Sequence, residues 1–529
     1  MKRYILSPAV MSAMLLAGCN DAWDDHYTAA PAEVSGATVL EQMKADPELS
    51  DFVRMVGIAG YEDLLNSSQT FTVWAPVNGS LGDVDMSDKA AVTRTVANHI
   101  ARFNISTSTP ADEGVKMLNG KLMYFAEGAM SFGGVSLVKT DIHTGNGLVH
   151  KLSAPIPYAY NFREYIDTHA STSEIASFMA RFDEMLLPSQ IPGATGTQAS
   201  DSVAVSYNRL LQYPDLGLGN IASEDSVFSM VVPDNTAWQK AFDEIKPYFT
   251  TYNADPEVAD SIQRMQTSLA IVSDLVFRTG LADPATADSV VSTTGSVISD
   301  PSAFFSGMDE IQASNGRLFL ASSLNYDMAE TFNKPIAIEA EAQSGRTPAA
   351  GTTVYTRNVS TDNPYASQIS GQRYIEVFPV SSSRQPGVTF AIPDILAGAY
   401  DIYATFVPAT VADGSNTTES TRVQFAVSFM GANGRTQSKA FNSRDFITSP
   451  TEMTVIKVTD GFRFPVANYY DRLWKMDPKN DPNDRVTTTS IYVSTNVTNT
   501  EFNQNVLSRR FRIDRIYLVP VSTNDAASK

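Results

Sequence analysis

The chain has 529 residues, of which 43% are hydrophobic and 18% are charged. These values predict several ordinary folded domains, roughly three once a leader is set aside. The net charge of −19 argues against nucleic acid and anionic lipid as partners, because both are bound through clustered Lys and Arg.

The first 18 residues predict a secretory signal peptide. Lys2 and Arg3 precede a mostly apolar run at 4–16, which is too short for a membrane-spanning helix. Residues 16–19 (LAGC) resemble the bacterial lipobox, whose cysteine is diacylated and becomes the mature N-terminus. The resemblance implies lipidation of Cys19, the single cysteine of the chain. The alternative is an ordinary secreted protein with an unrelated cysteine.

Residues 19–35 predict an acidic linker. Asp21, Asp24 and Asp25 follow the cysteine closely, and the segment resembles the export tag of surface lipoproteins in Bacteroidetes. The resemblance implies a lipid-anchored protein of the outer membrane that is exposed at the cell surface. A solvated linker requires the same small and acidic residues, so that alternative stays open.

Two similar stretches indicate an internal repeat. Residues 71–78 (FTVWAPVN) and 228–235 (FSMVVPDN) each predict a short buried strand. Each strand ends at a proline, which cannot donate a hydrogen bond to a neighbouring strand, and a turn-forming Asn follows.

A second pair of stretches predicts two β-hairpins. Residues 145–152 (GNGLVHKL) and 314–320 (SNGRLFL) share an Asn-Gly pair between apolar residues. We expect the turns at Asn146-Gly147 and Asn315-Gly316, because both residue types accept positive φ.

Helical patterns precede each repeated strand. Residues 38–44 and 52–58 have helical spacing, with a helix start at Asp46-Pro47. In the second copy, residues 162–186 read as helical, with a capping box at 171–174 (STSE). Helices that lead twice into a strand, turn, helix and hairpin predict two α+β domains.

The first copy resembles the fasciclin domain. Residues 71–78 look like the first motif of that family, and 146–150 (NGLVH) look like its closing hairpin. Asn98-His99-Ile100 lies where the family carries a Tyr-His pair. The resemblance implies an extracellular adhesion or matrix-binding protein rather than an enzyme.

The resemblance covers residues 36–158 well and residues 159–329 loosely. In the second copy, Asp274-Leu275-Val276 stands near the histidine motif without a histidine. Residues 187–206, rich in Pro, Gly, Ser and Thr, predict an inserted loop.

His99 is the residue that a catalytic mechanism would use. No cysteine, carboxylate pair or second histidine lies at ligand or triad spacing from it. We therefore interpret His99 as a hydrogen-bonded histidine that ties a helix end to the core.

Residues 330–529 predict an all-β sandwich. Apolar and polar residues alternate there in short runs separated by turn-rich spacers. The expected strands lie at 336–341, 373–378, 399–406, 423–429 and 511–518.

This region resembles the jelly-roll sandwich of galactose-binding-like carbohydrate-binding modules, on residues 338–341 (IEAE), 398–403 (GAYDIY) and 513–516 (IDRI). In several of those modules, carboxylates from the first and last strands hold a structural calcium ion. The resemblance implies calcium ligation by the set Glu339, Glu341 and Asp514. The alternative is that these acids only point to solvent from alternating strand positions.

Three aromatic residues are candidates for ligand binding. Tyr469, Tyr470 and Trp474 lie in an expected loop beside Asp471 and Arg472, and exposed rings in a loop suit stacking on sugars. The alternative is that they attach the loop to the core.

The sequence carries no zinc-protease, nucleophile-elbow, phosphate-loop or dinucleotide motif, which favours a non-catalytic role. The first hypothesis is a glycan-binding accessory lipoprotein of a nutrient-uptake system, beside a TonB-dependent channel (SusC-like) and a SusD-like lipoprotein. The second is an adhesin for host matrix or neighbouring cells, and the third is a structural envelope component.

Overall fold

The computed structural model describes residues 36–82, 84–108, 114–126, 130–194, 203–278, 283–325, 327–481 and 486–521. The chain divides into two compact units, Met1–Tyr160 (unit 1) and Asn161–Lys529 (unit 2). The predicted signal peptide, Cys19 and the acidic linker lie outside the described residues. Within the described ranges, no helix is both long and apolar enough to cross a bilayer.

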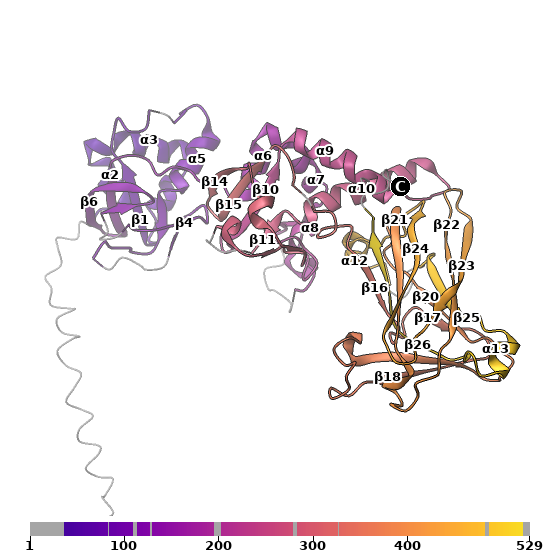
Figure 1. Ribbon diagram of the computed structural model, residues 1–529. Coiled ribbons are helices and arrows are strands. Elements are labelled where there is room, and N and C mark those ends of the chain that lie inside the picture. Colours follow the sequence, from indigo (N-terminus) through magenta and orange to yellow (C-terminus); the bar gives the residue numbers. More distant parts are fainter. Residues whose placement is uncertain are drawn as a thin grey trace, which may run out of the picture. The chain divides into compact units, whose positions relative to one another are not determined.

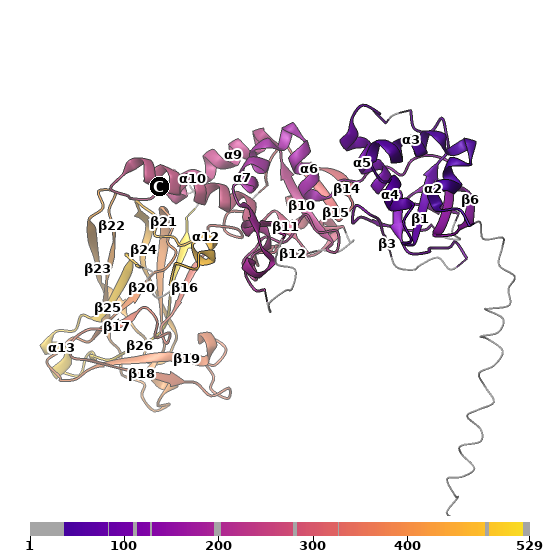
Figure 2. The same ribbon diagram turned by 180° about the vertical axis from the view of Figure 1, so that it is seen from behind.

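Unit 1 is an α+β domain built on one sheet of order β2-β1-β7-β6-β5. Its helices are α2 (Val39–Lys44), η1 (Pro47–Leu49), α3 (Ser50–Ala59), α4 (Glu62–Leu65) and α5 (Lys89–Ala97). Its strands are β1 (Phe71–Pro76), β2 (Ile100–Arg102), β3 (Val115–Lys116), β4 (Leu122–Met123), β5 (Ser131–Phe132), β6 (Val135–Thr144) and β7 (Gly147–Leu152). Helices α2, α3 and α5 lie over one face of the sheet (Figure 2), where their apolar side chains pack against Phe71, Val73 and Val149.

Unit 2 begins with a second α+β region whose sheet has the corresponding order β11-β10-β15-β14 (Figure 1). Its helices are α6 (Phe162–Thr168), η3 (Ala170–Thr172), α7 (Ser173–Ala180), η4 (Pro188–Gln190), α8 (Arg209–Gln212), α9 (Asn235–Ile245), η5 (Lys246–Phe249), α10 (Pro256–Ser273), η6 (Pro284–Thr286) and α11 (Pro301–Phe304). Its strands are β8 (Asp183–Leu186), β9 (Val205–Asn208), β10 (Phe228–Pro233), β11 (Val276–Phe277), β12 (Val290–Val291), β13 (Val297–Ile298), β14 (Asp309–Ala313) and β15 (Gly316–Ala321).

The predicted repeat is confirmed at the level of strand register. The central strands pair in parallel, with Phe71 opposite Gly147 in unit 1 and Phe228 opposite Gly316 in unit 2. The backbone N–H of Trp74 donates to His99 O, as that of Val231 donates to Leu275 O, both at 2.9 Å. Leu275 therefore takes the place of His99 in the second copy.

The predicted Asn-Gly turns are wrong by one residue. The hairpins close at Thr144 opposite Gly147 and at Ala313 opposite Gly316, so their turns are residues 145–146 and 314–315. Each glycine is instead the first residue of a central strand. A Cβ at Gly147 would lie 1.8 Å from Phe71 O, so only glycine permits this strand contact.

Asn146 works through its side chain rather than through a positive φ. Val39 N–H donates to Asn146 Oδ1 (2.7 Å), and Asn146 Nδ2 donates to Leu65 O (2.9 Å) and Ser67 O (2.8 Å). Asn315 repeats the arrangement in unit 2, accepting from Phe162 N–H at 3.1 Å. Each Asn thus fixes the first helix of its copy to the end of the hairpin.

The expected helix start at Asp46 is confirmed, because its side chain accepts from Glu48 N–H. The capping box at 171–174 is wrong: α7 begins at Ser173 without a side-chain cap. The Thr172 hydroxyl donates to Ile166 O (2.7 Å) instead, and Asn235 Oδ1 accepts from Glu174 N–H (3.1 Å). A long-range contact supplies the cap that the local pattern predicted.

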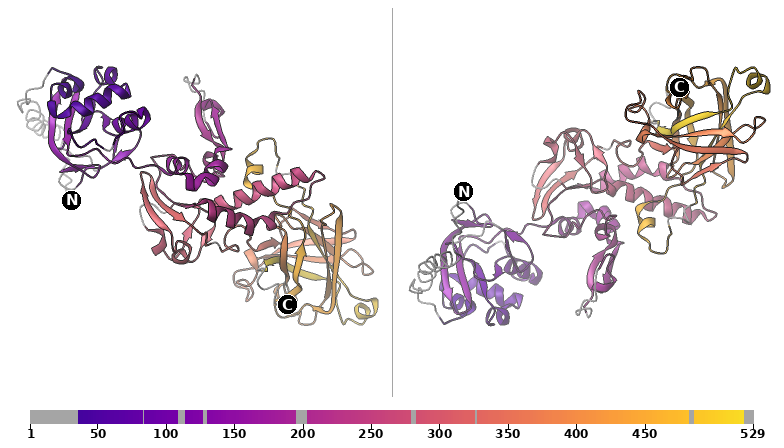
Figure 3. Two further views of the ribbon diagram at one scale, coloured as in Figure 1. Left: turned by 90° about the horizontal axis from the view of Figure 1, so that it is seen from above. Right: turned by 90° about the horizontal axis from the view of Figure 1, so that it is seen from below.

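The predicted loop at 187–206 is wrong at its far end. Residues 205–206 belong to β9, which pairs with β8, so the insertion extends a hairpin. Figure 3 shows this purple hairpin standing out from the helices of unit 2.

The remainder of unit 2 is a β-sandwich of two sheets (Figure 1). One sheet has the order β18-β19-β26-β21-β24, with β16 also paired to β26, and the other has the order β17-β20-β25-β22-β23. The strands are β16 (Ile336–Glu339), β17 (Arg346–Pro348), β18 (Thr352–Asn358), β19 (Arg373–Pro379), β20 (Gly387–Ala391), β21 (Gly398–Phe406), β22 (Arg422–Met430), β23 (Thr436–Ile447), β24 (Thr454–Phe464), β25 (Ser490–Thr495) and β26 (Phe511–Pro520). Short helices are η7 (Ser370–Gln372), η8 (Ala409–Val411), α12 (Arg472–Met476) and α13 (Asn499–Asn503). All five expected strands form, and their alternate apolar residues fill one core between the sheets.

Backbone hydrogen bonds join the α+β region of unit 2 to its sandwich. Ala397 N–H donates to Tyr248 O (2.8 Å), and Ala467 N–H donates to Thr250 O (2.7 Å). Arg472 Nη1 adds a bond to Leu216 O (2.8 Å). We call this boundary the seam, and these bonds fix the position of the loops along it.

Candidate ligand-binding site

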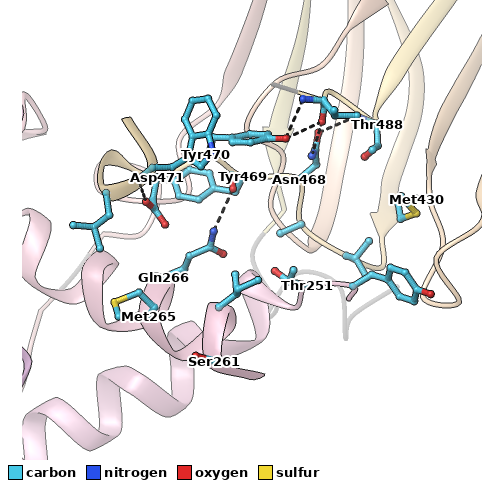
Figure 4. Close-up of a pocket in the computed structure, with 17 residues that line it drawn as sticks. Thr251, Ser261, Met265, Gln266, Met430, Asn468, Tyr469, Tyr470, Asp471 and Thr488 are labelled. Carbon is cyan, nitrogen blue, oxygen red and sulfur yellow. Dashed lines mark hydrogen bonds between the residues drawn. The ribbon is translucent and has the colours of Figure 1, made fainter. Parts of the chain in front are cut away.

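The three predicted aromatic residues line one cavity of about 600 Å³ at the seam, which we call the aromatic pocket. Tyr469 and Tyr470 come from the loop before α12, and Trp474 lies on α12. Figure 4 shows the opposite wall, where α10 presents Met265 and Gln266. The sequence-predicted residues are therefore brought together, although their binding role stays a prediction.

The loop is held by its own side chains. Asp471 Oδ1 accepts from Trp474 N–H (2.9 Å) and so caps α12. Val486 N–H donates to the Tyr470 hydroxyl (3.0 Å), and the Tyr470 and Trp474 rings meet edge to face at 4.8 Å. All three predicted aromatics are half-buried. The rings thus attach the loop to the protein, which was the alternative to ligand binding in the sequence analysis, and they also line the pocket.

Gln266 is a pocket residue that sequence reasoning missed. Its Nε2 donates to Tyr469 O (3.2 Å), while its Oε1 is buried without a hydrogen-bond partner among the described residues. An unpaired buried acceptor is costly, and a ligand hydroxyl would reach Oε1 only after the Gln266 side chain turned toward the cavity. The only sequence signal was a polar residue on a mostly buried stretch of α10.

Burial also shapes the ionisation of this pocket. It raises the pKa of Tyr469 from its ordinary value of 10 to about 12. Burial raises the pKa of the Asp471 carboxyl, against the lowering effect of the Trp474 N–H. The pocket offers aromatic faces, an amide, hydroxyl groups and the Asp471 carboxyl, and these groups suit the binding of a polyol.

His99 in unit 1 has both ring nitrogens occupied by the backbone. Ile156 N–H donates to Nε2 (2.8 Å), so the proton lies on Nδ1, which donates to Thr95 O (2.7 Å). Burial lowers the pKa of His99 to about 4. The prediction of a hydrogen-bonded histidine that ties a helix end to the core is confirmed.

The three predicted calcium ligands lie close to one another at the junction of β16 and β26, which pair in an antiparallel register. Glu339 Oε2, Glu341 Oε2 and Asp514 Oδ2 are buried and lack hydrogen-bond partners in the described structure. Asp514 is fully buried, and its Oδ2 lies 3.9 Å from Arg515 Nε. The expectation that these acids only point to solvent is thus wrong for Asp514.

The electrostatics of this cluster suit a cation. Burial raises the pKa of the Asp514 carboxyl to about 7, Ser370 N–H opposes that shift, and the Glu339 charge adds to it. Hard carboxylate oxygens without partners are the ligands that Ca²⁺ prefers. No group of three or more Asp, Glu, His or Cys side chains in the described residues has a geometry that could hold a metal as it stands. A cation would have to draw the carboxylates closer together.

Comparison with protein-family models found a match to one part of the chain. Residues 47–157, the larger part of unit 1, match the model of the fasciclin domain. No curated protein matches the chain.

Several solved structures are similar in part. A FAS1 domain pair of the insect cell adhesion molecule fasciclin I has 12% identity and a TM-score of 0.20, over 54% of this chain and 98% of that chain. The C-terminal family 22 carbohydrate-binding module of Clostridium thermocellum Xyn10B has 11% identity and a TM-score of 0.21, over 35% of this chain and 93% of that chain. The CBM22-1 xylan-binding domain of Paenibacillus barcinonensis Xyn10C has 12% identity and a TM-score of 0.21, over 36% and 94%. Values this low establish neither a shared fold nor a shared function.

Proposed function

We propose that this protein binds a glycan without catalysis, in the aromatic pocket. The observation that supports this best is the convergence of the Tyr470, Trp474 and Gln266 side chains on one cavity. Sugar rings have apolar faces that pack on aromatic side chains and hydroxyl edges that need polar partners. The backbone bonds of the seam hold these groups in place before a ligand arrives.

Calorimetric titration of the purified protein with a panel of neutral oligosaccharides tests this proposal. Trp474→Ala should weaken binding about tenfold, or ~1.4 kcal/mol. Tyr355→Ala is the matched control, because Tyr355 is a half-exposed ring on β18 that does not line the pocket. Equal losses in both variants, or no oligosaccharide binding by the wild type, would contradict the proposal.

We also propose that the protein is a lipoprotein of the outer membrane, anchored through Cys19 and exposed at the cell surface. The LAGC sequence at 16–19 and the acidic residues after it support this. Cys19→Ser should move the protein from the membrane fraction to the soluble fraction. Retention of the variant in the membrane would argue against lipid anchoring.

Within that setting, we propose an accessory role in glycan uptake, with a TonB-dependent channel and a SusD-like lipoprotein as partners. Extraction of the tagged protein from native membranes in mild detergent should recover both partners in near-stoichiometric amounts. The second candidate is an adhesin, which the fasciclin match at 47–157 favours. Recovery of the protein alone, together with binding of whole cells to matrix proteins, would favour the adhesin.

Finally, we propose that Glu339, Glu341 and Asp514 hold a structural calcium ion. The buried, unpaired carboxylate oxygens support this assignment. The ion would neutralise the charges and tie the first strand of the sandwich to the last, and it would supply no chemistry to the aromatic pocket.

A further inference from the structure

We propose that a second cavity at the seam, of about 300 Å³, binds the carboxylate of an acidic sugar. This inference rests on the proposed glycan-binding function and names the class of glycan. We call the space the cationic cavity, because Lys334, Arg472 and Lys475 all line it. Two carboxylates, those of Asp274 and Asp394, also line it.

Among the described residues, none of the three cations forms a direct ion pair with a carboxylate, although Asp274 and Asp471 act electrostatically on Arg472. Lys334 Nζ donates to the Ser296 hydroxyl (2.7 Å), and Arg472 Nη1 donates to Leu216 O (2.8 Å), both of which are neutral acceptors. No carboxylate oxygen of a described residue lies within 4.0 Å of the charged nitrogens of these three side chains. Arg472 therefore keeps N–H donors for a ligand, in the planar arrangement that binds a carboxylate through two parallel bonds.

Neutral groups donate hydrogen bonds to both carboxylates of the cavity. Asp274 Oδ1 accepts from the hydroxyls of Ser292 (2.7 Å) and Thr294, and Asp394 Oδ1 accepts from Tyr470 N–H (3.2 Å). The charged side chains that line the cavity are three cations and two carboxylates, so the lining has one more positive than negative group, whereas the whole chain carries −19. Walls of low dielectric strengthen the attraction of such a site for an anion.

The guanidinium of Arg472 shows the same imbalance. Burial lowers its pKa, and this effect exceeds the opposing influence of Asp274, Tyr469 and Asp471. An anionic ligand would add to the compensation that Asp274 and Asp471 already give.

The position of the cavity favours a sugar acid over an acidic peptide. Tyr469 and Gln266 line both the cationic cavity and the aromatic pocket. The two spaces are therefore neighbours across these side chains. A glycan that stacks in the aromatic pocket has an adjacent place for a carboxylate, as in a polymer that contains uronic acid.

The test compares oligogalacturonate with a neutral galactan oligosaccharide of the same length, by calorimetric titration of the full-length protein at low and high salt. Lys334→Gln and Lys475→Gln together should weaken oligogalacturonate binding about tenfold and leave neutral binding unchanged. Lys479→Gln is the control for net charge, since it is exposed and lines neither cavity. The wild-type preference for the acidic oligosaccharide should fall as salt rises.

The outcomes separate this inference from the proposed function. Neutral binding that depends on Trp474, without any preference for oligogalacturonate, would overturn the cationic cavity and keep the glycan proposal. Equal losses in the double variant and in Lys479→Gln would also overturn it. Binding of a glutamate-rich peptide in preference to oligogalacturonate would assign the cavity to peptides, and binding of neither oligosaccharide would refute both proposals.

Discussion

Acid should destabilise unit 1 through one buried histidine. His99 accepts a hydrogen bond from Ile156 N–H, so a proton on Nε2 would remove that bond and leave a charge in the core. The pKa is about 4 in the folded protein, against an ordinary value of 6.5. The unfolded chain therefore takes up the proton first as the pH falls, and the free energy of unfolding decreases between pH 6.5 and pH 4.

The size of this effect follows from the shift. A shift from 6.5 to about 4 corresponds to roughly 3 kcal/mol at ~1.36 kcal/mol per unit of pKa. At pH 5 the free energy of unfolding should already be about 2 kcal/mol lower than at neutral pH, because the histidine of the unfolded chain is almost fully protonated there and that of the folded protein is not. Below pH 4 His99 is protonated in both the folded and the unfolded protein, so its effect on the free energy of unfolding no longer changes with pH.

The assay is hydrogen exchange with mass spectrometry on peptides from α3 and α5, corrected for intrinsic exchange, at a series of pH values. His99→Gln cannot titrate in this range. The difference between wild type and variant isolates His99 from other acid-sensitive groups such as His150, whose pKa burial also lowers. If the pH dependence of the two proteins is the same from pH 7 to pH 4, the argument is wrong.

Three further predictions concern the paired asparagines, the glycine at the start of β7 and the carboxyl group of Asp514. Asn146→Ala breaks two buried hydrogen bonds and one part-buried hydrogen bond and should lower the free energy of unfolding of unit 1 by about 3 kcal/mol. Asn315→Ala should have the same effect on unit 2. Calorimetry in which both variants shift the same unfolding transition would refute the equivalence of the two asparagines. Gly147→Ala places a Cβ 1.8 Å from Phe71 O at a φ of +153° and should lower the stability of unit 1 by about 3 kcal/mol or more; an unchanged melting temperature would show that β1 and β7 pair differently. Because the pKa of Asp514 is raised to about 7 from 3.8, stability in chelator should fall as the pH rises from 4 to 7, and millimolar calcium should abolish that fall. Asp514→Asn should remove both responses, and a chelator-insensitive wild type would refute the metal assignment.

The fold was predictable wherever local pattern and tertiary context agree. Alternating runs such as 373–378 and 399–406 became strands, because their apolar faces fill the sandwich core. The Asn-Gly pairs revealed the repeat in the sequence, but the sequence did not predict the structural role of either residue in the pair. The Asn side chains bind backbone far away in sequence, and the glycines make room for a parallel strand.

The sequence predicted only the wall of the aromatic pocket that carries the aromatic residues. Tyr469, Tyr470 and Trp474 cluster within six positions, so their proximity was visible in the sequence. Gln266 lies about 200 residues away and reaches the pocket only through the packing of α10 on the sandwich. The same holds for Lys334 and Arg472, whose shared cavity depends on the seam. Sequence spacing cannot report such encounters between distant segments.

The backbone bonds across the seam also bear on how this protein could evolve and be engineered. Tyr248 O and Thr250 O each accept a bond from the sandwich, so excision of the sandwich would leave two carbonyl groups without their partners. The sandwich is therefore not an independent module of this chain. Residues on both sides of the seam should change together, and a transplanted sandwich would lose both cavities unless η5 and α10 travelled with it.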